Sequence, residues 1–145
     1  MGTTPQRVSV FPVRWLDWYG DGSLHVLEIG LACCSLELAA AAYDVPALPA
    51  ALPPRSRVVV VVSGTVTDRL APAVVAMVDA CATLTGRTPL VVALGACASS
   101  GGPYWDSYSV TKGVDELVGV DVYVPGCPPP PEALRAVLDD LRAAA

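Results

Sequence analysis

Five consecutive valines, Val58 to Val62, constrain the fold more than any other feature of this sequence. A continuous β-branched run of strand length is typical of a strand buried on both faces, as in a parallel sheet covered by helices. Similar patterns predict strands at 23–29, 58–62, 89–94 and 120–124, and helices at 35–43, 71–85, 113–118 and from 131 onwards. This alternation predicts an α/β fold, a three-layer sandwich with a mainly parallel four-stranded sheet.

The chain of 145 residues fits a single domain. We expect an α/β domain over 23–145, preceded by an N-terminal aromatic arm over 1–22. The arm carries four aromatic side chains that we expect to pack on this domain or on a neighbour: Phe11, Trp15, Trp18 and Tyr19.

Charge and hydropathy restrict the partners. With nine Lys and Arg and a net charge of −5, the chain lacks the basic patch that nucleic acid binding needs. No apolar run approaches the roughly 18 residues of a membrane span. The first residues lack the apolar core of a signal peptide, so we expect a cytoplasmic protein. The apolar content of 53% predicts a partner interface in addition to a core.

Four of the five cysteines directly follow predicted strands. Cys33 and Cys34 follow the first strand, Cys97 the third and Cys127 the fourth. In open parallel sheets, ligands bind beyond the carboxyl ends of the strands. The sequence therefore predicts that these four thiols lie at one edge of the sheet, where they would hold a metal centre.

Two metal centres use four thiolates, a [4Fe–4S] cluster and a structural zinc ion. Zinc sites usually contain C-x2–4-C pairs, which the adjacent Cys33 and Cys34 do not form. The linear C-x2-C-x2-C spacing of ferredoxins is also absent. Disulfides are a weaker explanation, because five is an odd number and the chain is expected to stay in a reducing compartment. The topology favours the cluster, while a zinc-stabilised interaction module without redox function stays open.

Small residues flank the four thiols. Glycine allows close backbone approach and leaves N–H groups free to point at sulfur, which stabilises a cluster and tunes its potential. Pro128 follows Cys127 and would shield the site. The glycines concerned are Gly30, Gly95, Gly101, Gly102 and Gly126.

The remaining chemical signals are weak. Cys81 shares a helical stripe with Val74 and Val78, so we interpret it as a buried apolar group. His25 is the only histidine, and we interpret it as structural. We predict no catalytic residue, because no Ser/His/Asp or Cys/His set is present. The sequence also lacks both common phosphate-binding glycine motifs.

Four segments carry a family resemblance: 30–37 (GLACCSLE), 64–67 (GTVT) with Ala71 and Pro72, 95–102 (GACASSGG) and 120–129 (VDVYVPGCPP). Together they resemble the 20 kDa-type subunit of NADH–quinone oxidoreductase, the respiratory complex I. That family is related to the small subunits of [NiFe] hydrogenases. The resemblance covers about 24–141, nearly the whole chain.

The resemblance implies a flavodoxin-like fold and one [4Fe–4S] cluster bound by Cys33, Cys34, Cys97 and Cys127. The cluster would be the last of a relay and would pass electrons to quinone at the interface with a larger subunit. A ferredoxin-like iron–sulfur subunit and membrane subunits would be further partners. The chain would be peripheral on the cytoplasmic side of the bacterial plasma membrane, and not catalytic alone.

The resemblance and the motifs also imply a set of residues that line the cluster. Arg69 would neutralise its charge or lie on the surface, and Glu37 matches an acidic position near the cluster or is a solvated helix residue. The full lining set is Gly30, Glu37, Gly64, Thr65, Gly95, Ser99, Gly101, Gly126 and Pro128.

Three features depart from the family pattern. Pro130 stands where the family usually has an arginine, which removes one cationic contact. The segment 102–110 is one residue longer, and with 23–26 it is similar to small subunits of energy-converting [NiFe] hydrogenases. Those enzymes tend to carry C-x-x-C where this chain has Cys33 and Cys34. A hydrogenase-like complex is therefore the alternative, and a large subunit with two C-x-x-C motifs for nickel would identify it.

Overall fold

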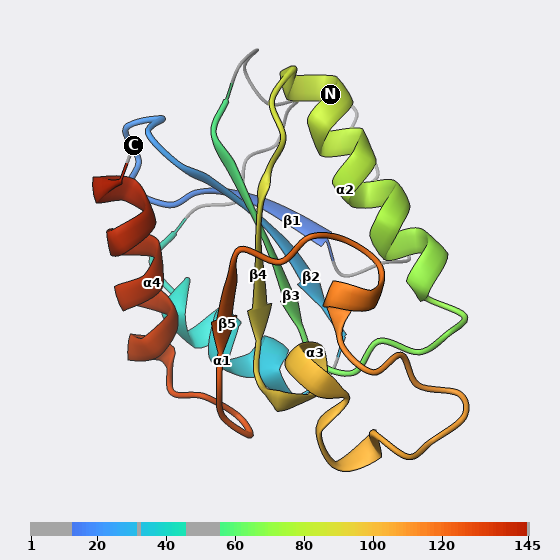
Figure 1. The fold of residues 1–145 in the computed structure, drawn as a ribbon. Coiled ribbons are helices and arrows are strands. Elements are labelled where there is room, and N and C mark those ends of the chain that lie inside the picture. The colour runs from blue at the N-terminus through green and yellow to red at the C-terminus, as the bar shows by residue number, and fades with distance from the viewer. Residues whose placement is uncertain (1–12, 32, 46–55, 145) are drawn as a thin grey trace, which may run out of the picture.

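The computed structural model describes residues 13–31, 33–45 and 56–144. Its centre is one five-stranded sheet in sequential order, β1-β2-β3-β4-β5 (Figure 1). β1 pairs with β2 in antiparallel orientation, and the other neighbours are parallel. The strands are β1 (Val13–Asp17), β2 (His25–Gly30), β3 (Val58–Ser63), β4 (Leu90–Leu94) and β5 (Val122–Val124).

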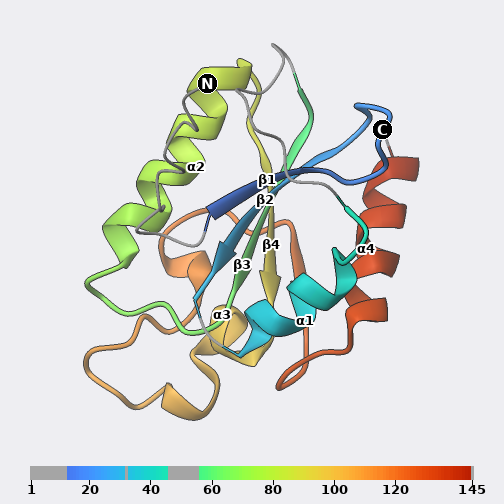
Figure 2. The same ribbon diagram turned by 180° about the vertical axis from the view of Figure 1, so that it is seen from behind.

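Helices cover both faces of the sheet, which confirms the predicted three-layer α/β fold. α1 (Cys34–Ala41) and α4 (Pro131–Ala143) lie together on one face (Figure 2). α2 (Ala71–Thr85) covers the other face. Short helices α3 (Ala96–Ser100), η1 (Gly102–Tyr104) and η2 (Val114–Glu116) lie in the connection from β4 to β5.

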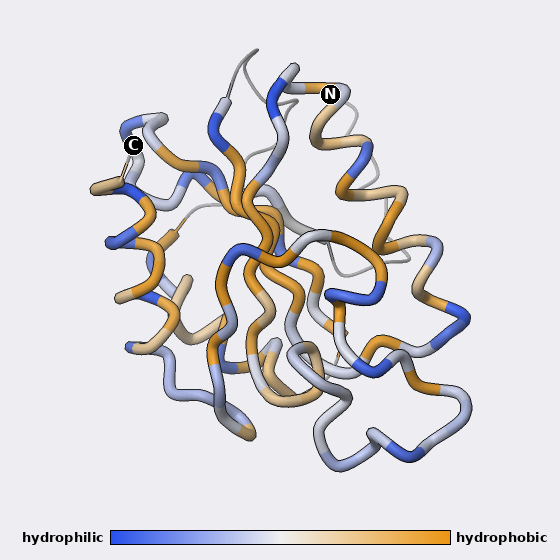
Figure 3. Tube along the Cα trace, in the orientation of Figure 1, coloured by the Kyte–Doolittle hydropathy of each residue, from blue (hydrophilic) through white to orange (hydrophobic). Residues whose placement is uncertain are grey.

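The valine run forms the middle of the core, as its composition predicts. Alternate side chains point to opposite faces of a strand. Val60 therefore packs in the cluster under α2, whereas Val59 and Val61 pack in the cluster under α1 and α4. All three are 0% exposed. The trace coloured by hydropathy shows this apolar centre, with the polar residues mostly at the periphery (Figure 3).

The sheet has one strand more than the four predicted. Residues 13–17 belong to the expected arm but form β1, and Trp15, Trp18 and Tyr19 pack against the two core clusters of this domain. Phe11 lies outside the described residues. Because β1 covers the free edge of β2, all six residues of β2 are buried, including the polar His25 and Glu28. The alternation of 23–29 predicted a strand correctly, but it did not reveal this burial.

Other boundaries move by a few residues. The predicted helix 71–85 is confirmed, and Gly86 ends it in the left-handed conformation. The predicted helix 113–118 is reduced to the three residues of η2. α3 was not predicted. Within the described part of the chain, no helix combines the length and apolar character needed to cross a membrane.

Candidate metal centre at the carboxyl edge of the sheet

The four predicted ligands stand at the starts of helices or in turns that follow strands. Cys33 is the N-cap of α1, and Cys34 is the first residue of that helix. Cys97 is the second residue of α3, directly after β4. Cys127 lies in the turn between β5 and α4 and precedes Pro128 in a cis peptide bond. All four therefore follow the carboxyl ends of parallel strands, as predicted.

The connections leave the sheet toward both faces. α1 follows β2 and packs on the face that α4 also covers, whereas α3 follows β4 and contributes Ala98 to the core cluster under α2. A crevice at the carboxyl edge is expected where neighbouring connections part in this way. Cys34 and Cys97 thus approach the edge from opposite faces of the sheet.

Two of the thiols are buried and two face outwards. Cys34 is 1% exposed and Cys97 is 5% exposed. Cys33 and Cys127 are exposed. The cysteines therefore have an inner side, closed by the sheet, and an outer side that is open in the isolated chain.

Glycines make room for the buried sulfur atoms. Gly95 has a φ of 93°, and a Cβ atom on it would collide with Sγ of Cys34. A Cβ atom on Gly102 would lie 3.1 Å from Sγ of Cys97. Substitution at either position would therefore push against a thiol, which gives these two glycines a role beyond turn formation.

Backbone hydrogen bonds hold the cysteine-bearing turns together. The N–H of Gly95 donates to the carbonyl of Val124, and the N–H of Ala96 donates to that of Gly126, both at 2.8 Å. These bonds join the turn before Cys97 to the turn before Cys127. On the next strands, the N–H of Leu31 donates to the carbonyl of Ser63 at 2.8 Å.

The electrostatics of Cys34 show that the thiols are close to one another. Burial raises the pKa of Cys34 to about 12. The neighbouring Cys33 raises this pKa further by charge repulsion and a hydrogen bond, and Cys97 and Cys127 add to the rise. Cys34 therefore stays protonated at neutral pH unless a bound cation compensates its charge. A coordinating metal does so, because it deprotonates a thiol outright.

The donor set fits a group larger than one ion. Among the described residues, no three His, Cys, Asp or Glu side chains are close enough to hold a single metal ion. Four thiolates around one zinc ion stand about 3.8 Å apart, as Zn–S bonds of about 2.3 Å in a tetrahedron require. In a four-iron cube each thiolate binds a different iron, so the sulfur atoms must stand farther apart. Four thiols that surround one site without closing on a single point match the second requirement.

Several predicted lining residues serve the backbone near the cysteines. A Cβ atom on Gly30 would lie 2.9 Å from Cβ of Ser35, so Gly30 lets α1 approach β2. Gly101 ends α3 with a φ of 87° and lets the backbone at Trp105 approach. Ser99 donates its hydroxyl hydrogen bond to the carbonyl of Gly95 at 2.7 Å, which stabilises the turn.

The other predicted lining residues lie at the same edge or on the surface. Gly64, at a φ of 108°, and the half-buried Thr65 follow β3. Glu37 is half-buried in the first turn of α1. Gly126 has a φ of 141°, and a Cβ atom there would lie 2.6 Å from Cα of Pro129. The remaining two, Pro128 and the charge-neutralising candidate Arg69, are exposed.

The two residues interpreted as structural are both buried. Cys81 is 1% exposed and packs in the core under α2, where burial raises its pKa to about 11. The interpretation as an apolar core group is confirmed. His25 is 3% exposed on β2, and its Nδ1 atom has no hydrogen-bond partner in the described structure.

An exposed aromatic loop beside α3 was not recognised as part of this edge. It follows Gly101 and contains Tyr104, Trp105 and Tyr108, which are 54%, 61% and 97% exposed. Three aromatic residues in a short polar segment were the available signal, since exposed large apolar groups often mark interfaces.

Fold and thiol arrangement define a class, the α/β proteins with a cysteine site at the carboxyl edge of a mainly parallel sheet. Comparison with known proteins gives the particular family. Residues 28–141 match the model of the family described as NADH ubiquinone oxidoreductase, 20 Kd subunit, and the chain belongs to this family. The expectation from the motifs is therefore confirmed.

The relatives include B-type subunits of NADH-quinone oxidoreductase from two bacterial genera. The one numbered 1 in Salinispora tropica is 49% identical over 130 residues, which are 85% of this chain and 67% of the relative. The one numbered 2 in Streptomyces griseus is 50% identical over 125 residues, 82% of this chain and 52% of the relative. The chain thus spans between about half and two thirds of the length of these relatives.

A solved structure gives the same picture. In the membrane-bound sulfane sulfur reductase, an archaeal respiratory membrane complex, one chain matches with a TM-score of 0.52 and 30% identity. The match covers 63% of this chain and 49% of that chain.

Proposed function

We propose that this protein is an electron-transfer subunit of a membrane-associated respiratory complex, with one [4Fe–4S] cluster bound by Cys33, Cys34, Cys97 and Cys127. The observation that carries the proposal is the proximity of three other thiols to the buried Cys34. Membership of the 20 kDa subunit family supports it, because that resemblance implies an iron–sulfur subunit. A cluster held there would supply one-electron transfer.

The residues around the thiols would perform three tasks. Gly95 and Gly102 leave space for the sulfur atoms of Cys34 and Cys97. The sheet and α1 exclude water from the buried side, which lowers the local dielectric constant. Cys33 and Cys34 begin α1, whose N-terminal amides carry partial positive charge and favour thiolates.

The exposed side would face a partner. Cys33 and Cys127 are the open half of the ligand set, and the exposed Trp105 and Tyr108 lie in the neighbouring loop. We propose that a larger subunit covers this side, that electrons pass towards quinone there, and that a ferredoxin-like subunit supplies them. Binding to membrane subunits on the cytoplasmic side of the plasma membrane belongs to the same proposal.

The cluster is tested by anaerobic reconstitution of the purified chain with iron and sulfide. We expect about four irons and four sulfides per chain, and an EPR signal after reduction. Replacement of Cys97 by Ser should reduce iron and signal, whereas Cys81→Ala, a matched control in the core, should keep both. One zinc per chain without sulfide would instead support the zinc-stabilised module.

The acceptor needs its own test, because the matched archaeal structure is that of a sulfane sulfur reductase. The larger subunit that co-purifies with the chain should be sequenced, and the complex assayed for quinone reduction. A large subunit with two C-x-x-C motifs and bound nickel would favour the hydrogenase-like alternative. Absence of quinone reduction by an intact, reduced complex would contradict the quinone part of the proposal.

A further inference from the structure

Helix α2 is apolar on nearly its whole circumference. Asp79 is the only charged residue among its fifteen. Its buried stripe, which includes Val74, Val78 and Cys81, already satisfies the contact with the sheet. A helix that is hydrophobic all round is normally buried on more than one side. The outer side of α2 therefore has the composition of a covered surface, although it is exposed in the isolated chain.

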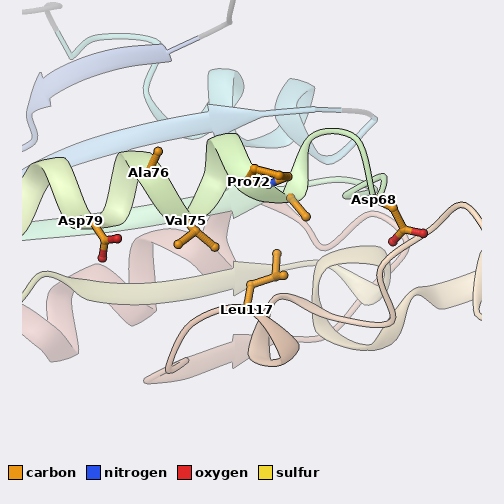
Figure 4. Close-up of a pocket in the computed structure, with 7 residues that line it drawn as sticks. Asp68, Pro72, Val75, Ala76, Asp79 and Leu117 are labelled. Carbon is orange, nitrogen blue, oxygen red and sulfur yellow. The ribbon is translucent and has the colours of Figure 1, made fainter.

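A groove of about 480 Å³ runs along this outer side, between α2 and the segment after η2. Figure 4 shows Val75 and Leu117 pointing toward each other across it, with Asp68 and Asp79 at opposite ends. The helix rises about 12 Å between Ala71 and Asp79. The groove is thus long enough for about two turns of a helix, and its lining is apolar between two carboxylates.

The acidic ends are built into the fold. The hydroxyl of Thr111 donates to Oδ1 of Asp68 at 3.0 Å, and the N–H of Asp68 donates to the carbonyl of Ser109 at 2.9 Å. These bonds hold Asp68 at its end of the groove, while Asp79 is exposed at the other. The exposed Glu116 directly precedes Leu117 and adds negative charge to this side.

We propose that this groove docks a segment of another protein subunit, in which apolar side chains stand between basic residues. The apolar floor would bury the apolar side chains, and Asp68 and Asp79 would each face a Lys or Arg at one end. A second copy of the chain is a poorer occupant, because its net charge of −5 repels an acidic groove. The inference uses a surface without the four thiols and holds whether or not they bind a cluster.

Photo-crosslinking in the assembled complex tests the docking. A photoreactive residue replaces Ala76, an exposed position that lines the groove, and a matched control replaces Ala136, which is exposed on α4. We expect position 76 to yield a peptide of one other subunit, with Lys or Arg flanking its apolar residues. Cross-links to the same chain, to lipid alone, to a peptide without basic residues, or no more than at position 136, would overturn the proposal.

Charge reversal tests the acidic ends separately. Asp79→Lys should lower the cross-link yield at position 76 by roughly five-fold, as expected for the loss of one exposed ion pair. Asp140→Lys, at an exposed position of α4, should leave the yield unchanged. Circular dichroism would verify that both variants fold. Equal yields in the two folded variants would show that charge complementarity does not hold the segment.

Discussion

Gly95 and Cys34 are far apart in sequence, yet a single methyl group on Gly95 would collide with the sulfur atom of Cys34. The contact joins the end of β4 to the start of α1. It means that the turn after one strand shapes the space for the thiol that follows another strand. The geometry of the proposed metal centre therefore depends on a residue that binds nothing itself.

Replacing Gly95 by Ala should displace Cys34 and impair cluster binding. The substitution also places a Cβ on a residue with a φ of 93°, which is strained for any L side chain. We expect the reconstituted variant to hold less than half the iron of the wild type and to unfold at a lower temperature. Gly119→Ala is the matched control, since a Cβ there meets nothing within 4 Å. Equal iron content in the two variants would refute this role of Gly95.

The raised pKa of Cys34 predicts an alkaline loss of stability in the metal-free protein. Burial and the neighbouring thiols raise this pKa from 9.0 to about 12, so the folded state holds its proton where the unfolded state has released it. The contribution is complete below pH 9 and is lost as the pH rises toward 12. Urea unfolding at pH 8 and pH 10 should therefore show a clear decrease in stability.

The Cys34→Ala variant separates this effect from the other titrating groups. Cys81 and Tyr19 also have raised pKa values, about 11 and about 12, and they keep their own alkaline dependence in the variant. The variant should thus lose less stability between the two pH values than the wild type. An identical pH dependence in both proteins would argue against a strongly perturbed Cys34.

Arg135 of α4 should stabilise the helix that begins with the tandem cysteines. Its guanidinium donates to the carbonyls of Ala41 at 3.3 Å and Ala40 at 3.2 Å, at the C-terminal end of α1. A cation at that end satisfies orphan carbonyls and interacts favourably with the helix dipole. Arg135→Ala should cost about 1 kcal/mol of unfolding free energy.

A conservative variant distinguishes charge from geometry at this position. Arg135→Lys keeps the charge but loses the planar fork that reaches two carbonyls, so we expect it to recover part of the lost stability. Chemical denaturation of the three proteins is the measurement. A fully stable Arg135→Ala protein would show that packing between α1 and α4 suffices without this contact.

The sequence predicted the parts of the fold that local patterns determine. The valine run identified β3, and the apolar stretch with Gly86 at its end gave the bounds of α2. The positions of Cys33, Cys34, Cys97 and Cys127 after strands also predicted their shared edge. The rule that parallel strands end at the same side needs no knowledge of detailed packing.

Features that depend on tertiary contacts were missed. β1 was interpreted as part of an arm, because its strand character becomes evident only in its pairing with β2. α3 has five residues between Gly95 and Gly101, and so short a helix carries no periodicity to detect. The contact of Gly95 with Cys34 is equally invisible in the sequence, since it arises where two separate turns meet.

Iron anomalous diffraction from crystals of the reconstituted chain tests the central claim most directly. We predict one compact group of iron peaks at the carboxyl edge of the sheet, surrounded by the sulfur atoms of Cys33, Cys34, Cys97 and Cys127. An iron-free edge, a single metal ion there, or sulfur atoms of these cysteines directed away from a common centre would contradict the account.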